Sequence, residues 1–526
     1  MRHPAGYHDY SRHRKPLVPR ALISVSDKRG IVGFARGLID LGWEIISTGG
    51  TAATLRAAGL AVTPVDQVTG FPEMLDGRVK TLHPAIHAGL LARRDLPEHQ
   101  AALKEHHITA IDLVAVNLYP FQATIAKPDV TFEDAIENID IGGPSMLRSA
   151  AKNHTHVLVI VDPADYPVII EALKQGEVSP LARRQLAAKV FSHTADYDGA
   201  IASFFSPRED GLPSHLGISL KRAQVLRYGE NPEQRAALYV TEEPRGINDL
   251  KQRHGKELSF NNLLDLDAGM AAASLWQNRP ACVIIKHTTP CGIALGATPE
   301  QAFTRALATD PQSAFGGVIA INTVVDRATA LAMRDHFIEV VVAPSFHDDA
   351  LEIFQAKKNI RIVELPIGVG RQGLDFKSVR GGFLVQDRFA FDRADTAWKV
   401  STARRPTTEE VRDLQFAWCA VSWVKSNAVL LARDEMAIGI GAGQMSRVDS
   451  SFMAVHKARQ QGHDPKGSVM ASDGFFPFAD SVDEAVAAGV TAIIQPGGSV
   501  RDAEVIAAAD HHNIAMIITG KRQFRH

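Results

Sequence analysis

The residues that decide the fold are 21–59, which read ALISVSDKRGIVGFARGLIDLGWEIISTGGTAATLRAAG. The short apolar run ALISVS precedes a turn, DKRG, and then come apolar residues at helical spacing, Ile31, Phe34 and Leu38. The pattern repeats at once, because WEIIS predicts a strand, STGGT a loop, and AATLRAAG a helix that ends at Gly59. Similar patterns follow at IDLVAVNLYPF and HVLVIVDP. This alternation predicts an open, mainly parallel α/β sheet.

Length and composition narrow the class of protein. The chain has 526 residues, 45% apolar and 22% charged, which is typical of a soluble multidomain protein. Its 57 Lys and Arg against 59 Asp and Glu exclude the basic character of a nucleic-acid binder, and no apolar run approaches the roughly 18 residues that span a bilayer. Cys282, Cys291 and Cys419 form no CxxC pair, so no disulfide framework is expected. We expect a cytoplasmic enzyme.

The chain divides into a tail and two domains. Residues 1–20 are basic, rich in His and Pro and without an apolar stripe, and we predict a disordered tail. The segment 206–222, SPREDGLPSHLGISLKR, concentrates Pro, Gly, Ser and charge, which indicates a boundary between domains over 21–215 and 216–526. The second domain continues with α/β patterns such as ACVIIKH and SAFGGVIAIN. About 300 residues are many for one sheet, so we predict two stacked α/β subdomains.

Two loops of the first domain have the character of anion sites. SDK at residues 26–28 and TGGT at 48–51 both stand where a strand gives way to a helix. Free backbone N–H groups and the helix dipole favour an anion there, and Lys28 adds a cation. Neither loop matches a Walker loop or a GxGxxG fingerprint. Spacing alone therefore does not distinguish a phosphate site from an ordinary tight turn.

Further polar segments follow at RVKT (residues 78–81) and DIGG (residues 140–143). A solvated charged face is the ordinary explanation for an Arg–Lys pair of this kind. His83 and His87 have the i,i+4 spacing of metal ligands, but a proline interrupts them and no Glu or Cys completes a site. We predict no metal there.

Eleven motifs in one order resemble the bifunctional family of AICAR formyltransferase fused to IMP cyclohydrolase, where AICAR is 5-aminoimidazole-4-carboxamide ribonucleotide. They are SVSDKRG, STGGTAATLRAAGL, TGFPEMLDGRVKTLHPAIHAGLLARR, NLYPF, IDIGGPSMLRSAAKNH, LRYGENPEQ, KHTTPCG, SAFGGVIA, VKSN, GIGAGQMSR and SDGFFPF. The resemblance implies an N-terminal methylglyoxal-synthase-like open parallel sheet and a C-terminal region of two cytidine-deaminase-like α/β subdomains. It also implies a homodimer whose transformylase sites draw residues from both subunits.

For the N-terminal domain the resemblance implies ring closure of formyl-AICAR to IMP with loss of water. The residues implied to hold the nucleotide are Ser26, Asp27, Lys28, Thr48, Gly49, Gly50, Thr51, Arg78, Thr81, Asn117, Ile141 and Gly142. Those implied around the reacting atoms are Lys80, Tyr119, Asp140 and Lys152. A carboxamide nitrogen is a weak nucleophile, so proximity supplies most of the help, while Lys stabilises an oxyanion and Asp and Tyr move protons. The residue that moves each proton stays open.

For the C-terminal domain the resemblance implies formyl transfer from 10-formyltetrahydrofolate to AICAR. Lys286 and His287 end the apolar strand ACVII; a strand-end His alone is more often a surface residue, but the resemblance makes His287 the general base and Lys286 its support. Asn427 would orient the formyl group. The residues implied to bind AICAR are Arg227, Tyr228, Gly316, Glu339, Arg447, Phe475 and Arg522. Those implied along the folate are Val448, Asp480, Ser499 and Val500.

Other functions remain as alternatives. A zinc deaminase needs H-x-E and P-C-x-x-C, but GIA follows Pro290-Cys291 and no H-x-E occurs, so zinc deamination is excluded. GIGAG at residues 439–443 departs from a dinucleotide loop, and the resemblance puts a structural monovalent cation, usually potassium, near it. Methylglyoxal synthase activity fits the motifs RVKTLHP, NLYPF and IDIGG poorly. A transformylase with an inactive cyclohydrolase domain and a non-catalytic purine-nucleotide sensor both stay open.

Overall fold

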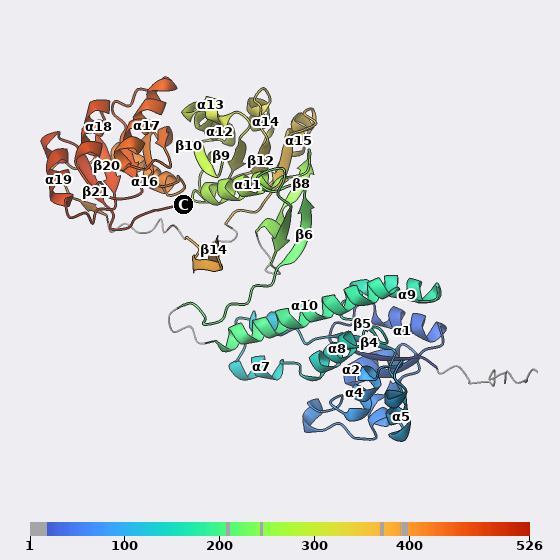
Figure 1. Cartoon of the computed structure of the whole chain (residues 1–526). Coiled ribbons are helices and arrows are strands. Elements are labelled where there is room, and N and C mark those ends of the chain that lie inside the picture. Colours follow the sequence, from blue (N-terminus) through green and yellow to red (C-terminus); the bar gives the residue numbers. More distant parts are fainter. Residues whose placement is uncertain (1–17, 207–210, 242–245, 369–372, 390, 392–397) are drawn as a thin grey trace, which may run out of the picture. The chain divides into compact units, whose positions relative to one another are not determined.

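The computed structural model describes residues 18–206, 211–241, 246–368, 373–389, 391 and 398–526. The chain forms two compact units, Met1–Ser219 and Leu220–His526, and the division falls inside the segment rich in Pro and Gly (Figure 1). The predicted tail lies outside the described residues over 1–17, and the first strand begins at Arg20.

Unit 1 is an open parallel sheet with strand order β3-β2-β1-β4-β5, as the sequence predicted. Its strands are β1 Arg20–Val25, β2 Glu44–Ser47, β3 Thr63–Pro64, β4 Leu113–Asn117 and β5 Leu158–Ile160. Its helices are α1 Ile31–Asp40, α2 Gly49–Ala57, α3 Val65–Thr69, α4 Pro84–Leu91, α5 Pro97–Glu105, α6 Phe121–Ile125, α7 Phe132–Glu137, α8 Gly142–Lys152, α9 Tyr166–Lys174 and α10 Pro180–Phe205, with 3-10 turns η1 Leu75–Gly77 and η2 Pro163–Asp165.

Both faces of this sheet are buried, which explains why its strands are almost continuously apolar. Successive residues of a strand point to opposite faces, so Leu22 joins the core beneath α8 and α10, while Ala21 and Ile23 join the core beneath α1 and α9. Figure 1 shows the long helix α10 lying along one side of unit 1, next to α8. The polar loops are therefore left at the ends of the strands.

Unit 2 is built on a mixed, twelve-stranded sheet with order β16-β21-β20-β19-β17-β18-β10-β9-β11-β12-β13-β8, and two separate hairpins, β6-β7 and β14-β15. Its strands are β6 Lys221–Leu226, β7 Ala236–Val240, β8 Lys251–His254, β9 Ala281–Lys286, β10 Thr289–Leu295, β11 Val318–Ile321, β12 Val340–Ala343, β13 Arg361–Glu364, β14 Leu374–Val379, β15 Gly382–Asp387, β16 Lys399–Val400, β17 Val429–Arg433, β18 Met436–Gly441, β19 Val469–Ser472, β20 Ala492–Gln495 and β21 Ala515–Ile518. Its helices are α11 Phe260–Ala273, α12 Pro299–Thr309, α13 Pro311–Ala314, α14 Arg327–Met333, α15 Asp348–Gln355, α16 Thr408–Val421, α17 Arg447–Gln460, α18 Asp480–Ala488 and α19 Asp502–His511, with the 3-10 turn η3 Ile247–Asp249.

The large sheet consists of two halves with the same order of elements. In each half a short strand and a helix (α11 or α16) precede a β-hairpin, which is followed by helices alternating with three parallel strands. The halves meet where β10 pairs with β18, at Ala294 and Met436, and α11 and α16 share one core in which Trp276 stacks on Phe416 at 5.6 Å. Figure 1 shows α12, α14 and α15 around the first half and α17, α18 and α19 around the second.

This arrangement differs in one respect from the prediction of two stacked subdomains. The halves lie edge to edge in one continuous sheet, because the hairpin of each half ends in an unpaired strand edge and pairing the two edges satisfies their backbone groups. Such long-range pairing leaves no pattern in the local sequence.

Candidate functional site

The carboxyl edge of the unit 1 sheet gathers the loops after β1, β2 and β4. The backbone N–H groups of Ser26 and Asp27 donate to Oδ1 of Asn117 at 2.6 and 2.8 Å, and Nδ2 of Asn117 donates back to the Asp27 carbonyl at 3.0 Å. Asn117, at the end of β4, thus fixes the loop after β1. The side chain of Asp27 bonds instead to Arg29, which lowers the pKa of Asp27.

Threonine hydroxyls tie the TGGT turn to β1 in the same way. Ser24 and Thr48 share a hydrogen bond of 2.7 Å, and Oγ1 of Thr51 donates to the Val25 carbonyl at 3.0 Å and accepts from its N–H at 3.1 Å. Thr48 and Thr51 are buried by these contacts. The first backbone N–H groups of α2 are left at the edge of the sheet without intrahelical partners.

Two lysines lie over the glycines that begin α2. A side-chain carbon on Gly49 would be 3.7 Å from Nζ of Lys80, and one on Gly50 would be 3.8 Å from Nζ of Lys28. Two cations beside the start of a nine-residue helix make a strong site for an anion. In the described part of the chain Lys80 forms a single, long ion pair, with Glu73 at 3.7 Å, so its charge is available to a ligand. The structure therefore brings Lys28, Gly49, Gly50 and Lys80 together.

Asp140 and Thr81 meet at the start of α8. Oδ1 of Asp140 accepts from the Gly143 N–H at 2.7 Å, and a side chain on Gly142 would come 2.7 Å from Oγ1 of Thr81, so this approach requires glycine. Burial raises the pKa of Asp140, although Gly143, the Tyr119 backbone and the charge of Lys80 act against the rise. A buried carboxylate near an ammonium group is a typical acid–base arrangement.

Other predicted residues of unit 1 lie around this group. Tyr119 and Ile141 are exposed, and Arg78 forms an exposed ion pair with Glu137. Sequence reasoning missed Tyr197 of α10, whose hydroxyl accepts from the Asp140 N–H at 2.8 Å and donates to the Asn138 carbonyl at 3.1 Å. No spacing signal could have linked Tyr197 to a turn 57 residues away.

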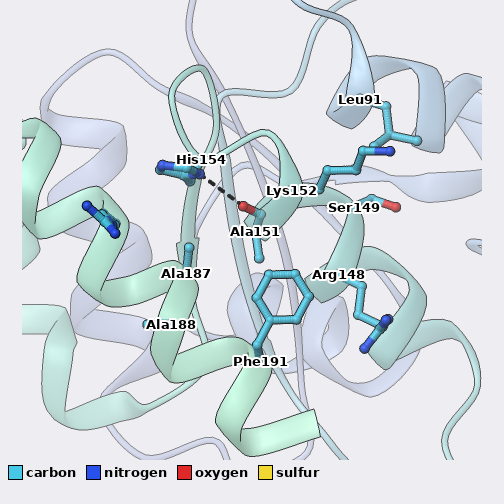
Figure 2. Close-up of a pocket in the computed structure, with 10 residues that line it drawn as sticks. Leu91, Arg148, Ser149, Ala151, Lys152, His154, Ala187, Ala188 and Phe191 are labelled. Atoms are coloured by element: carbon cyan, nitrogen blue, oxygen red, sulfur yellow. Dashed lines mark hydrogen bonds between the residues drawn. The ribbon is translucent and has the colours of Figure 1, made fainter. Parts of the chain in front are cut away.

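Lys152 lies apart from the other predicted residues. It is the last residue of α8, and Asp140 precedes the first, so the eleven residues of the helix separate them by about 16 Å. Lys152 lines a cavity of about 660 Å³ with Leu91, Arg148, Ser149, Ala151, His154, Arg184, Ala187, Ala188 and Phe191. Figure 2 shows Lys152 and Arg148 projecting from α8. The Arg148 guanidinium lies 5.5 Å from the centre of the Phe191 ring.

In unit 2, Lys286 and His287 stand at the end of β9. Nζ of Lys286 donates to the carbonyls of Phe315 and Gly316 at 2.8 and 3.1 Å, which places Gly316 beside it. His287 and Thr288 form the tight turn to β10, both with positive φ, of 55° and 61°. This turn leaves the imidazole of His287 exposed at the edge of the sheet.

Glu339 precedes β12, close to the same edge. Its Oε2 lies 2.5 Å from Nη1 of Arg361, and its backbone N–H donates to the Gly317 carbonyl at 3.1 Å. Arg227 and Tyr228 follow β6 in the separate hairpin, with the Arg227 guanidinium 5.3 Å from the Tyr228 ring. Glu339 is therefore tied to the Gly316 loop, whereas no hydrogen bond, ion pair or ring contact joins Arg227 or Tyr228 to His287 in the described part of the chain.

The second half of the sheet holds a buried polar cluster around Arg447. Nη2 of Arg447 donates to Oδ1 of Asn427 at 2.8 Å, and Nη1 bonds to Ser472 at 2.9 Å and to the fully buried Asp473. The amide of Asn427 donates to the carbonyls of Gln444 and Met445 at 2.9 and 3.2 Å. Asn427 is thus held in one orientation. Sequence reasoning missed Asp473, although SDG at a strand end was a usable signal.

The remaining predicted residues surround this cluster. Phe524 lies between two arginines, 6.0 Å from the guanidinium of Arg447 and 5.0 Å from that of Arg522. Phe475 is 43% exposed and Val500 is wholly exposed. Val448, Asp480 and Ser499 lie at or near the beginnings of α17, α18 and α19.

The two sets of unit 2 residues share one edge of the sheet but lie well apart. β9 ends at Lys286 and the antiparallel β17 begins just after Asn427, with β10 and β18 between them. Three inter-strand spacings separate the sets by about 14 Å. One chain therefore does not bring His287 and Asn427 into contact.

Neither a metal-binding cluster nor a membrane-spanning helix occurs among the described residues. No three His, Cys, Asp or Glu side chains in that part of the chain lie close enough together to hold a metal ion. None of its helices is both long and apolar enough to cross a membrane.

Comparison with known proteins identifies the family. One family model, described as an AICARFT/IMPCHase bienzyme, matches residues 150–457, and another, described as an MGS-like domain, matches residues 30–145. A solved structure described as ForH is 39% identical over 36% of this chain and 99% of its own, with a TM-score of 0.33, which is too low to bear on the fold. Because the bienzyme model covers more than half of the chain, the chain belongs to the AICAR transformylase/IMP cyclohydrolase family, which catalyses the final steps of purine biosynthesis with formyl-tetrahydrofolate as cosubstrate.

Proposed function

We propose that this chain catalyses both reactions itself, one in each unit. Unit 2 would transfer the formyl group of 10-formyltetrahydrofolate to the AICAR amine, giving formyl-AICAR and tetrahydrofolate, and unit 1 would close formyl-AICAR to IMP and water. The observation that carries the proposal is the pair of lysines over Gly49 and Gly50, next to a carboxylate with a raised pKa. The unit 1 site thus retains both an anion cradle and an acid–base group.

In unit 1 the substrate phosphate would bind at the start of α2. The N–H groups of the two glycines and the ammonium group of Lys28 surround that position. The remaining contacts would come from the loops around it, with Asn117 and Thr51 holding the loops in place. The residues proposed for this shell are Ser26, Asp27, Thr48, Thr51, Arg78, Thr81, Asn117, Ile141 and Gly142.

Ring closure needs a base, a cation and an acid at one point. The carboxamide nitrogen attacks the formyl carbon, so a C–N bond forms and the oxygen that becomes negative takes a proton. The resulting hydroxyl takes a second proton and leaves as water, while the nitrogen that carried the formyl group loses its proton and a C=N bond forms. Lys80 would stabilise that oxygen, and Asp140 would take the nitrogen proton, since its raised pKa makes it a stronger base. Tyr119, whose backbone bonds to Asp140, would supply a proton.

Lys152 stands apart from these residues, because the length of α8 separates it from Asp140. If Lys152 acts in ring closure, Lys152→Ala lowers the kcat of cyclisation as strongly as Lys80→Ala does. If its place in the cavity is only structural, Lys152→Ala leaves that kcat within about threefold.

In unit 2, His287 would take a proton from the AICAR amine as the amine attacks the formyl carbon. The C–N10 bond of the folate then breaks, and Lys286 would supply the proton that the departing nitrogen needs. Asn427, oriented by Arg447, would orient the formyl group. AICAR would contact Arg227, Tyr228, Gly316, Glu339, Arg447, Phe475 and Arg522, and the folate would contact Val448, Asp480, Ser499 and Val500.

A second copy of the chain would complete the unit 2 site. The gap of about 14 Å between β9 and β17 supports this, because it exceeds the reach of a single reacting group. In a homodimer, His287 of one copy and Asn427 of the other would face the same substrate. The exposure of Phe475 and Val500 agrees with a surface that a partner covers.

A monovalent cation such as potassium would have a structural role near the Arg447 cluster. Oδ2 of the fully buried Asp473 has no hydrogen-bond partner among the described residues, and such an oxygen suits a hard cation. Exchange of potassium for a bulky organic cation is then expected to lower Tm while leaving the cyclisation rate unchanged.

The direct test is a coupled absorbance assay with purified protein, AICAR and 10-formyltetrahydrofolate. We expect tetrahydrofolate and IMP to appear together. Tetrahydrofolate without IMP would mean an inactive cyclohydrolase, and neither product despite AICAR binding would mean a nucleotide sensor. Either result would contradict the proposal.

A further inference from the structure

We propose that Asp265 of α11 is a positioning residue that holds the turn carrying His287 in its catalytic geometry. The inference deepens the proposed formyl transfer and rests on His287 being its general base. Oδ1 of Asp265 accepts a hydrogen bond of 2.7 Å from the backbone N–H of Thr288, and the backbone of His287 bonds to the same carboxylate. Both amides of the turn are therefore tied to one side chain.

The turn needs such a support because of its backbone. His287 and Thr288 have φ values of 55° and 61°, in the left-handed region that side chains other than Gly, Asn and Asp rarely occupy. Thr288 is β-branched, which makes this conformation less favourable still. The carboxylate compensates for the strain, and without it the turn can relax and carry the imidazole away from the edge of the sheet.

Asp265 is itself mounted on a rigid element. Ser259 and Asn262 form a capping box at the start of α11, with hydrogen bonds of 3.1 Å in each direction. One turn beyond Asp265, Gly269 lies so close to the sheet that a Cβ there would be 2.9 Å from Cβ of Ala320 and 3.2 Å from Cγ1 of Ile285. Because α11 is fixed at its start and packed closely on the sheet, the Asp265 carboxylate is held in one position.

The second half of the sheet contains the same arrangement of a helix carboxylate bonded to a β-turn, but that turn carries no histidine. Asp413 is the sixth residue of α16, as Asp265 is of α11, and its two oxygens accept from the N–H groups of Asp434 and Glu435 at 2.8 Å each. Those two residues form the turn between β17 and β18, with φ values of 52° and 59°. The strand directions place this turn at the opposite edge of the sheet from His287. Asp413 is thus a matched control with the same local function and no catalytic residue on its turn.

The test compares Asp265→Ala with Asp413→Ala in the full-length protein. Each preparation is assayed for kcat and KM of formyl transfer, for cyclisation of supplied formyl-AICAR, and for Tm, with His287→Ala as the reference for loss of the base. We expect Asp265→Ala to lower the kcat of formyl transfer about 10- to 100-fold, as a misplaced catalytic group does, with little change in the KM for AICAR. Asp413→Ala is expected to lower Tm similarly while keeping that kcat within about twofold.

Two further variants separate positioning from general damage. Asp265→Asn keeps one acceptor oxygen and is expected to retain most of the activity, and Thr288→Gly in the Asp265→Ala background is expected to restore kcat, because glycine adopts a positive φ without strain. The proposal is wrong if Asp265→Ala keeps full kcat, if Asp413→Ala lowers kcat equally, or if Thr288→Gly restores nothing. If His287→Ala itself keeps full activity, the assignment of the base fails instead.

Discussion

The two candidate sites differ in how far apart the strands that carry them lie. In unit 1 the loops follow β2, β1 and β4, which are neighbours, and Asn117 and Thr51 connect them by direct hydrogen bonds. In unit 2 the strands that carry His287 and Asn427 are separated by two others, about 14 Å in all. Strand order thus supports a unit 1 site within one chain and the proposal that a second copy completes the site of unit 2.

The largest expected effect is that of His287→Ala, which should slow formyl transfer and leave cyclisation unchanged. His287→Ala removes the proposed base and is expected to lower formyl transfer about 10²- to 10⁴-fold, while cyclisation of supplied formyl-AICAR continues at the wild-type rate. The measurement is the initial rate of each reaction on the same preparation. Parallel loss of both rates in a folded protein would contradict the division into two independent sites.

Lys80→Ala is the reciprocal change. Loss of the ammonium group over Gly49 is expected to slow cyclisation about 10²- to 10³-fold, as removal of an oxyanion stabiliser does, and to leave formyl transfer unchanged. Steady-state assays with formyl-AICAR and with AICAR plus the folate check this. A wild-type cyclisation rate would remove Lys80 from the chemistry.

Tyr197→Phe tests whether the Tyr197 hydroxyl stabilises the turn that carries Asp140. The change leaves the Asp140 N–H and the Asn138 carbonyl without the bridging hydroxyl, which is expected to cost about 1–3 kcal/mol in local stability. Hydrogen exchange of α8 peptides should speed up, and cyclisation should slow while formyl transfer does not. Unchanged exchange would mean that Tyr197 is dispensable to the turn.

Asp140→Asn removes the proposed base of ring closure and is expected to slow cyclisation about 10²- to 10⁴-fold, whereas its effect on stability is small and depends on pH. Burial raises the pKa of Asp140, so the folded protein holds this proton to higher pH than the unfolded chain does. Stability is therefore lost as pH rises from the unfolded pKa through the folded one, and the deficit is complete above it. An amide avoids the deficit, so the variant should be more stable than wild type at pH 7 and equal to it below about pH 4. Hydrogen exchange of β1 and β4 peptides measures this, and a less stable variant at pH 7 would contradict it.

The sequence allowed most of the fold and the family to be predicted, because these depend on local patterns and on motifs. The support from Tyr197 could not be predicted, since Tyr197 reaches its partner across 57 residues. Asp473 reaches Arg447 across 26 residues, and its place at a strand end was the only signal for it. The separation of Lys152 from Asp140 could have been predicted, because one uninterrupted helix from Gly142 to Lys152 must keep its two ends apart. Edge-to-edge joining of the two halves could not, since strand edges carry no sequence signature of their partner.

The most direct test of the contrast between a complete site and two half-sites is a mixed dimer. His287→Ala and Asn427→Ala chains with different tags are co-expressed, and the heterodimer is purified through both tags and assayed. Each homodimer should lack formyl transfer and retain cyclisation. The account predicts that the heterodimer recovers about half of the wild-type formyl transfer, because one of its two sites has both residues intact. A heterodimer without formyl transfer, or a wild-type monomer with full activity, would contradict it.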